Sequence, residues 1–327
     1  MEDIVAEVEK MLRCRDPKYG FLTYKCPNCG EVKTIPLTCK SRVCTSCGKK
    51  HADEWAEKLA RSLHDVPHRH MVFTIPDALR PVLEKNHGLL RVLMDAVSQT
   101  MKRIMAEKKR ATPGVICVLH PYGKDLTFNP HVHVLATEGG LTKRNEWVNV
   151  NFFEYGRLRR IWQYELLTGL KANMPNTPET SQLIDSLFKK YENGFYVYAK
   201  EKLFNAKKAA RYIGRYIRHP AIAESRITNF DEKANTVTFW YTRNGKQIET
   251  TMPALEFIDK LVKLIPDKNF KMIRYYGVYS RKTRKKLHNA ITALTRDIPA
   301  LPIEEPEPVI CPECGTPMQL IGITRPS

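Results

Sequence analysis

The sequence lacks the glycine-rich phosphate-binding patterns of nucleotide enzymes. Neither GxxxxGK[ST] nor GxGxxG occurs in its 327 residues, so nothing in it supports ATP or dinucleotide chemistry. No apolar run approaches the roughly 18 residues of a membrane span. The N-terminus MEDIVAEVEKMLRC is acidic and has no apolar core of the kind found in signal peptides. We therefore expect a soluble, cytoplasmic protein without a membrane segment.

Acidic residues are few relative to basic ones. The chain has 35 Asp and Glu residues against 53 Lys and Arg residues, which gives a formal net charge of +18 and a pI of about 9.5. A surface this basic indicates an anionic polymer as partner, with nucleic acid the first expectation and an anionic membrane the second. With 43% hydrophobic residues, the chain is long enough for two compact units with cores of their own.

Most cysteines occur as CxxC pairs, which in a reducing compartment are typical of metal ligands rather than disulfides. Cys26 and Cys29 in KCPNCG are followed by Cys44 and Cys47 in VCTSCG after a gap of 14 residues, just short of the usual zinc-ribbon spacing. We predict that these four thiolates bind one structural Zn²⁺. Cys117, in the apolar run VICVL, is expected to be a buried small hydrophobic residue.

The remaining cysteines have no partner that the sequence can assign. Cys14 and Cys39 flank the predicted zinc site, where they replace a ligand, build a second site or are simply buried. Cys311 and Cys314 supply only two ligands, so a metal at this pair requires Cys14, Cys39 or a histidine from elsewhere.

The order of apolar segments predicts an α+β fold. A strand at 71–75 is followed by an amphipathic helix with the apolar stripe Leu90, Leu93, Met94, Val97, Met101, Ile104 and Met105. The runs GVICVLH and HVHVLAT, separated by a connection with Gly and Pro, predict a hairpin. Helices, a strand at FYVYAK, the helix NAKKAARYIGRYI and further strands follow. This order predicts an open antiparallel sheet with helices on one face.

Two histidines lie inside one of the apolar runs, in the segment NPHVHVLAT. Because successive strand side chains point to opposite faces, His131 and His133 share a face at a separation of roughly 7 Å and can converge on one divalent cation. The alternative is a pair of half-buried histidines with ordinary hydrogen bonds. Asn129 and His120 would lie nearby if the hairpin forms, and either can complete or orient a site.

Two tyrosines lie among cations in the segment KKAARYIGRYIRHP. Tyr212 and Tyr216 are four residues apart, so they share one face of a helix. The alternative is an aromatic pair packed on the core. Gly214 lies between them and costs a helix about 1 kcal/mol, which argues for a special role of this segment.

The ordered motifs resemble those of one known family. KCPNCG, LTCKSRVCTSCG, HRHMVFTIP, LHPYGKDLTFNPHVHVL, YIGRYI, RYYGVYSRKTR and CPECG cover nearly the whole chain. Their order is similar to that of the two-tyrosine rolling-circle transposases of the insertion-sequence-91 family, which belong to the HUH (His-hydrophobe-His) endonuclease superfamily. The family often has His-Thr-Trp-Gly-Gln and His-Pro-His around the hairpin. Lys124 and Asn129 stand here instead, which leaves the third metal ligand open.

The resemblance implies a fold and a division of the chain. The fold is an HUH (Rep/relaxase-like) antiparallel sheet with helices on one face, preceded by a small cysteine-rich zinc module. The zinc-binding module would span 1–62 and the catalytic domain 63–300, with a helical insertion near 151–193. A linker and CxxC tail would occupy 301–327.

The resemblance also implies a chemistry. His131 and His133, with His120 as third ligand, would bind Mg²⁺ or Mn²⁺, which polarises the scissile phosphate. Tyr212 or Tyr216 would attack this phosphate, form a 5′-phosphotyrosine and leave a 3′-hydroxyl. Two tyrosines would allow two such links in alternation, without ATP.

Basic side chains would neutralise the DNA backbone. The candidates are Lys207, Lys208, Arg211, Arg215, Arg218, Arg281 and Arg284. About six to eight phosphate contacts would give a log–log salt slope of roughly −4 to −6 on single-stranded DNA. The alternative for YSRKTRKKL is an ordinary solvated helix face. The partners would be single-stranded element ends and target DNA in the bacterial nucleoid.

Two other functions are consistent with the same residues. One is a non-catalytic, zinc-dependent nucleic-acid-binding protein, in which the histidines and tyrosines are structural. The other keeps the HUH chemistry in a replication initiator or relaxase. The cysteine-rich N-terminus and the C-terminal CxxC favour the transposase over this last function, on the resemblance alone.

Overall fold

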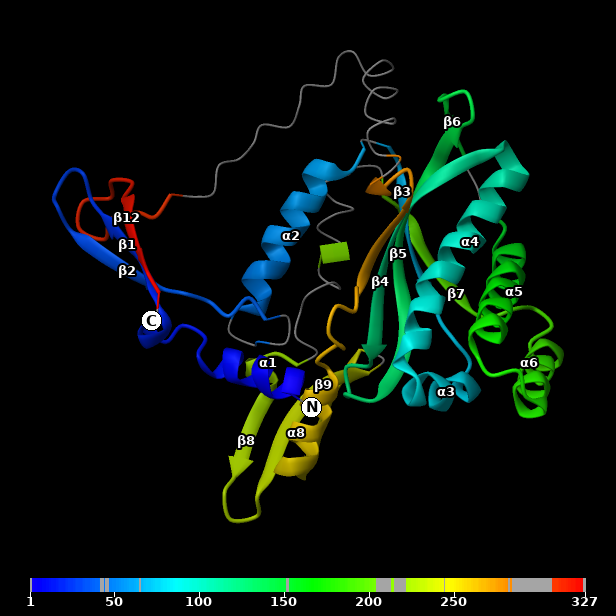
Figure 1. Ribbon diagram of the computed structural model, residues 1–327. Helices are drawn as coiled ribbons and strands as arrows, with labels where there is room; N and C mark the ends of the chain where they lie inside the picture. The colour runs from blue at the N-terminus through cyan, green and yellow to red at the C-terminus, as the bar shows by residue number, and fades with distance from the viewer. Residues whose placement is uncertain are drawn as a thin grey trace.

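The computed structural model of the chain (Figure 1) describes residues 2–41, 44, 47–64, 66–150, 153–203, 213–214, 222–243, 245–281, 283 and 308–325. Its largest sheet has six strands in the order β11-β4-β5-β3-β7, with β6 paired to β5. All of these pairings are antiparallel. The strands are β3 (His68–Phe73), β4 (Ala111–Tyr122), β5 (Phe128–Thr142), β6 (Trp147–Asn149), β7 (Val197–Leu203) and β11 (Ile273–Gly277).

The predicted hairpin forms the centre of this sheet. β4 and β5 pair from Ala111 opposite Thr142 to Tyr122 opposite Phe128. In the connection, the Asp125 carboxylate accepts hydrogen bonds from the backbone N–H and the hydroxyl of Thr127, at 3.2 and 2.7 Å. A local side-chain hydrogen bond of this kind stabilises a tight turn. The turn therefore closes the two long apolar strands on each other, as the sequence predicts.

Helices cover one face of the sheet through the predicted apolar stripe. All seven stripe residues of α4 (Leu90–Lys109) are buried, and they pack with Val115, Cys117 and Val134 of the central strands. α5 (Tyr155–Asn173) packs beside α4, and α6 (Pro178–Lys190) packs against α5 (Figure 1). The prediction that Cys117 is a buried hydrophobic residue is confirmed.

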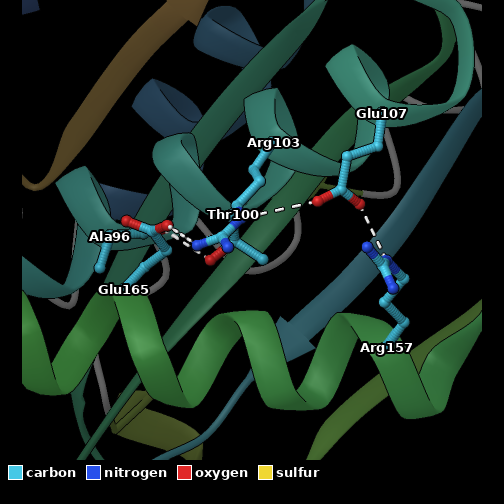
Figure 2. Close-up of polar contacts among 6 residues, drawn as sticks. All are labelled: Ala96, Thr100, Arg103, Glu107, Arg157 and Glu165. Carbon is cyan, nitrogen blue, oxygen red and sulfur yellow. Dashed lines mark hydrogen bonds and ion pairs between the residues drawn. The ribbon is translucent and has the colours of Figure 1, made fainter.

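Exposed ion pairs connect α4 and α5 along their outer side (Figure 2). Arg157 donates to Glu107 at 2.8 Å, and Arg103 donates to Glu165 at 3.1 Å. The hydrogen bond from Arg157 is the main reason that the pKa of Glu107 is lowered. Water and salt screen such pairs, so they align the two helices more than they stabilise the fold.

The opposite face of the sheet is covered in part by α2 (Gly48–Ser62), which lies across the sheet from α4 in Figure 1. Strand side chains alternate, so Ile116 and Val118 point away from α4 and pack with Leu59 of α2 and with Leu63 just beyond its end. The cysteine-rich N-terminal region therefore contributes a helix to the second face of the sheet, in addition to the predicted helices on the first.

Two smaller sheets complete the described structure. One has the order β12-β1-β2 and joins β12 (Gln319–Thr324), β1 (Phe21–Lys25) and β2 (Val32–Pro36). The other has the order β10-β9-β8 and joins β10 (Lys246–Pro253), β9 (Thr236–Arg243) and β8 (Ile227–Asp231), with α8 (Ala254–Lys263) following. The segments TVTFWYT and KQIETTM form the antiparallel hairpin of β9 and β10.

The remaining elements are short or terminal. They are α1 (Glu2–Leu12), α3 (Arg80–Lys85), and the 3₁₀ turns Pro17–Tyr19, Asp77–Leu79, His87–Leu89 and Glu224–Arg226. Within the described ranges, no helix has the length and apolarity to cross a membrane. The predicted α+β class, with an antiparallel sheet and a small cysteine-rich N-terminal module, is confirmed.

Candidate functional site

Three histidines from two adjacent strands lie together near the end of the central hairpin. His120 of β4 pairs directly with His131 of β5, and His133 follows at a two-residue step. The ring centroids are 5.5 Å apart for His120 and His131, 4.4 Å for His120 and His133, and 5.0 Å for His131 and His133. Each ring can present one nitrogen so that the three ligand atoms lie within 4.8 Å of one another. The structure brings together the three predicted metal ligands.

Hydrogen bonds at Nδ1 orient two of these rings. His131 Nδ1 lies 2.7 Å from the backbone carbonyl oxygen of Asn129 and donates its proton there. His133 Nδ1 lies 3.0 Å from Nε2 of His70 on β3, and we assign the shared proton to His133. A neutral ring protonated at Nδ1 carries its lone pair on Nε2. His131 therefore has the tautomer that binds a metal through Nε2, and His133 has it when the shared proton is on its Nδ1.

Burial favours the neutral form of His131 and His133. Desolvation lowers the pKa of His133 well below its usual range, and the neighbouring rings of His120, His131 and His70 lower it further. Burial also lowers the pKa of His131, against the opposing effect of its hydrogen bond to Asn129. Neutral imidazole is the form that coordinates a metal, so the site needs no deprotonation step at neutral pH.

The donor set fits a divalent cation. Ligand atoms that share one ion lie about 3 to 4 Å apart. The three histidine nitrogens lie within 4.8 Å of one another, so small side-chain movements bring them to that separation. In the described part of the chain no carboxylate joins them. Imidazole ligands suit transition-metal ions better than Mg²⁺, which prefers oxygen, so Mn²⁺ is the better match of the two predicted ions.

The two residues that depart from the family pattern have other contacts. Lys124 donates to the hydroxyl of Thr242 at 3.0 Å. Asn129 presents its backbone carbonyl to His131 and so helps to orient a ligand. His120 lies with His131 and His133 and stays the predicted third ligand.

The predicted nucleophiles Tyr212 and Tyr216 lie outside the described residues. The same holds for six predicted DNA-binding residues: Lys207, Lys208, Arg211, Arg215, Arg218 and Arg284. Arg281 is described, and its side chain is exposed. Ile213 and Gly214, which lie between the tyrosines in the sequence, are also described and both are buried.

Ile213 packs on the sheet face that carries the histidines. It belongs to one cluster with Leu135, which follows His131 and His133 at two-residue steps and so points to the same side. A Cβ atom on Gly214 would lie 2.5 Å from Cβ of Ala56 in α2. The close approach of α2 explains why this position is a glycine despite its cost in a helix.

The predicted zinc site is wrong in its grouping of cysteines. The structure divides its members between two clusters, Cys14 with Cys39, Cys44 and Cys47, and Cys26 with Cys29, Cys311 and Cys314. The pairing of β12 with β1 brings the C-terminal CxxC to the first N-terminal one. Partners that lie 282 and 288 residues apart cannot be assigned from local spacing.

The cluster made entirely of N-terminal residues has a compact thiol arrangement. Cys39 Sγ lies 3.4 Å from Cys47 Sγ, and it accepts a hydrogen bond from the backbone N–H of Ser41 at 3.4 Å. Cys14 Sγ accepts from the backbone N–H of Cys39 at 3.5 Å. Burial raises the pKa of the Cys39 and Cys47 thiols, so a bound cation is needed to ionise them at neutral pH.

Sequence reasoning missed His70 as a member of the histidine site. Its segment HRHMVFTIP predicted a strand, and the two-residue step from His68 to His70, directly before an apolar run, was the available signal. Both side chains are buried on the face opposite α4. Only the register that puts Val72 of β3 opposite His133 of β5 brings His70 within hydrogen-bonding distance of His133.

Comparison with known proteins identifies two family matches and two curated relatives. A family model described as "Putative transposase" matches residues 114–286, and one described as "Transposase zinc-binding domain" matches residues 1–75. The chain is 33% identical over 299 residues to the transposase for insertion sequence element IS801 of Pseudomonas savastanoi pv. phaseolicola, covering 86% of this chain and 72% of the relative. It is 25% identical over 307 residues to "Putative transposase y4qJ" of Sinorhizobium fredii (strain NBRC 101917 / NGR234), covering 88% of this chain and 77% of the relative.

A solved structure also matches. It is the crystal structure of the non-structural protein 1 N-terminal origin-recognition/nickase domain from the emerging human bocavirus. The match covers 71% of this chain and 96% of that chain, with 15% sequence identity and a TM-score of 0.28. A similarity at this level transfers no role to any residue described above.

Proposed function

The chain belongs to the insertion-sequence-91 family of transposases, and on this premise we propose that it nicks and rejoins single-stranded DNA at the ends of a mobile element. The proposed reaction is rolling-circle transposition through 5′-phosphotyrosine intermediates. The proposed place of action is the bacterial nucleoid. The division into a zinc-binding module, a catalytic domain and a tail stays a prediction.

One observation carries the proposal. The histidine cluster lies on the sheet face against which Ile213 packs, and Ile213 lies between Tyr212 and Tyr216 in the sequence. Ile213 therefore anchors this point of the chain, next to Tyr212 in the sequence, on the face that carries the histidines. A metal-binding cluster and a nucleophile-bearing segment on one face are the requirements of a DNA-nicking site.

The chain's own residues support each part of the chemistry. His120, His131 and His133 would hold the cation, which when bound supplies Lewis-acid polarisation of the scissile phosphate. Asn129 and His70 orient two of those rings through Nδ1. The hydroxyl oxygen of Tyr212 or Tyr216 forms a bond to phosphorus while the bond from phosphorus to the 3′ oxygen breaks. The phenolic proton leaves to solvent or a base, and the 3′ oxygen takes up a proton from solvent to become the free 3′-hydroxyl.

The phosphotyrosine bond conserves the energy of the broken phosphodiester, which is then available for rejoining the strand. One phosphodiester is exchanged for another, so attack by a 3′-hydroxyl on the phosphotyrosine restores the DNA strand and the tyrosine without a nucleotide cofactor. A second tyrosine allows a second link before the first is resolved. This alternation suits a reaction that cuts two element ends and transfers one strand between them.

In this proposal, basic side chains bind the phosphates of the DNA backbone. Arg281 is exposed close to the end of β11, Arg284 follows it in the sequence, and the other five candidates lie around the tyrosines in the sequence. About six to eight such contacts to single-stranded DNA give a log–log salt slope of roughly −4 to −6.

Covalent capture of DNA tests the proposal. The protein is incubated with Mn²⁺ or Mg²⁺ and a labelled single-stranded oligonucleotide from the element end, then denatured and run on a gel. We expect a protein–DNA adduct in the wild type and none in the Tyr212→Phe, Tyr216→Phe double variant. His131→Ala should lose the metal-dependent product.

Tyr164→Phe is the matched control, because it removes an exposed hydroxyl from α5 on the other face of the sheet. It should form the adduct at the wild-type level. No adduct with any divalent cation, together with intact DNA binding, would refute cleavage and favour a non-catalytic zinc-dependent nucleic-acid-binding protein. An adduct that persists in the double variant would refute the tyrosine assignment.

A further inference from the structure

The second cysteine cluster joins the two ends of the chain. Its two halves have almost the same sequence, CPNCG at 26–30 and CPECG at 311–315. Cys26 and Cys311 are buried, whereas Cys29 and Cys314 are exposed. Each half therefore offers one inner and one outer thiol to a shared centre.

The thiol distances fit one tetrahedral metal ion. Cys26 Sγ lies 3.5 Å from Cys314 Sγ, and Cys29 Sγ lies 3.5 Å from Cys311 Sγ and 3.6 Å from Cys314 Sγ. A zinc–sulfur bond of about 2.3 Å in tetrahedral geometry places sulfur atoms about 3.8 Å apart. A disulfide would require about 2.05 Å, and all four cysteines are in the free form.

The backbone of each half is folded as the same metal-binding knuckle. The N–H of Cys26 donates to the carbonyl of Glu31 at 2.8 Å, and the N–H of Gly30 donates to the carbonyl of Cys26 at 3.1 Å. In the other half, Cys311 donates to Thr316 at 3.0 Å and Gly315 donates to Cys311 at 3.1 Å.

A glycine closes each knuckle. Gly30 and Gly315 have φ of 78° and 70°, a backbone conformation that glycine adopts without strain. The sequence thus encodes two copies of one turn that presents paired thiols.

The surroundings hold the two knuckles against each other. β12 pairs with β1 from Phe21 opposite Thr324 to Lys25 opposite Gln319, directly beside the cysteines. Cys26 and Cys311 share a small apolar cluster with Met318 and the partly buried Tyr24. This cluster is too small to secure a chain terminus by apolar burial alone, and small units of this kind are commonly stabilised by a metal.

We propose that Cys26, Cys29, Cys311 and Cys314 bind a second structural Zn²⁺ that fastens the C-terminal segment 308–325 to the N-terminal module. The four thiols bind as thiolates and release their protons to solvent. The ion then closes a loop between Cys29 and Cys311 that contains the entire six-stranded sheet. This site is distinct from the cluster of Cys14, Cys39, Cys44 and Cys47, and it does not depend on the proposed DNA cleavage.

Zinc content of the full-length chain tests the proposal. Native mass spectrometry should count two zinc ions per wild-type chain and one in the Cys311→Ser, Cys314→Ser double variant. The Cys14→Ser, Cys39→Ser variant should also keep one. Glu313→Gln is the matched control, because it changes an exposed side chain of the same knuckle that is not a ligand, and it should keep two.

Two outcomes would overturn the proposal. One is a wild-type chain with a single zinc ion, or with a disulfide between the knuckles. The other is a Cys311→Ser, Cys314→Ser variant that still holds two ions.

A measurement on the wild type covers the case in which the variants do not fold. Cys29 and Cys314 are exposed, so a thiol-alkylating reagent should modify them quickly unless a metal protects them. We expect both to resist alkylation until a chelator is added, after which hydrogen exchange should also quicken in β1 and β12 but not in β4 or β5. Rapid alkylation of both before chelation would refute a bound ion.

Discussion

We expect His70 to influence the metal affinity of the proposed histidine site by orienting His133. Its Nε2 lies 3.0 Å from Nδ1 of His133, and the two side chains are only 2% and 7% exposed. Replacing His70 by Ala removes the acceptor of the His133 proton. A buried N–H that loses its partner costs about 1 to 3 kcal/mol. The ring can avoid this cost by rotating or by moving its proton to Nε2, and either change takes the lone pair away from the metal.

The expected loss follows from this geometry. Residues that orient a metal-binding histidine typically contribute 10-fold to 100-fold in affinity, or about 1.4 to 2.7 kcal/mol. We expect His70→Ala to weaken Mn²⁺ binding by a factor in this range. His70→Gln should recover part of the loss, because its side-chain oxygen can accept the same proton. Mn²⁺ titration followed by electron paramagnetic resonance measures the dissociation constant directly.

A control separates this effect from general destabilisation. His87→Ala removes a histidine that lies outside the cluster, where it is 3.7 Å from Asp267, and it should bind Mn²⁺ like the wild type. Urea unfolding of each variant reports stability independently. Equal Mn²⁺ affinity in His70→Ala and wild type would show that His70 does not orient His133. Equal losses of Mn²⁺ affinity in His70→Gln and His70→Ala would lead to the same conclusion.

Two further predictions concern the second face of the sheet. Burial, followed by a smaller effect of His64, lowers the pKa of His68 from 6.5 to about 4. As the pH falls, the unfolded chain therefore protonates His68 at a higher pH than the folded chain does. About 3 kcal/mol of stability that is present above pH 6.5 is lost as the pH falls towards 4. In the His68→Gln variant the urea unfolding midpoint should depend less on pH across that interval. A pH dependence equal to that of the wild type would contradict this account. Gly214→Ala should destabilise the protein by about 1 to 3 kcal/mol and reduce adduct formation, because its Cβ would lie 2.5 Å from Ala56. Gly156→Ala, whose Cβ would meet nothing closer than 4.0 Å, should be neutral or slightly stabilising in the same urea assay; equal effects of the two substitutions would refute the close approach.

Local patterns in the sequence determine the elements and which side chains share a face. The stripe of α4 is buried as its three- and four-residue spacing predicts, because a helix repeats every 3.6 residues. His131 and His133 lie on one face because a strand alternates with a period of two. His120 joins them because a tight turn fixes the register of β4 on β5. Each of these features depends on residues close together in the chain.

Tertiary structure alone decided which distant groups meet. Cys26 and Cys29 lie with Cys311 and Cys314, and not with the predicted Cys44 and Cys47, because β12 pairs with β1. The sequence could not indicate this, since one thiolate is chemically as suitable a ligand as another. His70 reached His133 through the register between β3 and β5, which no local period specifies. The sequence by itself therefore determined the secondary structure, the histidine pair and the family. The completion of the cluster of Cys26, Cys29, Cys311 and Cys314 and the contact of His70 with His133 depended on long-range strand pairing, because these groups converge according to where strands lie in space and not according to their spacing along the chain.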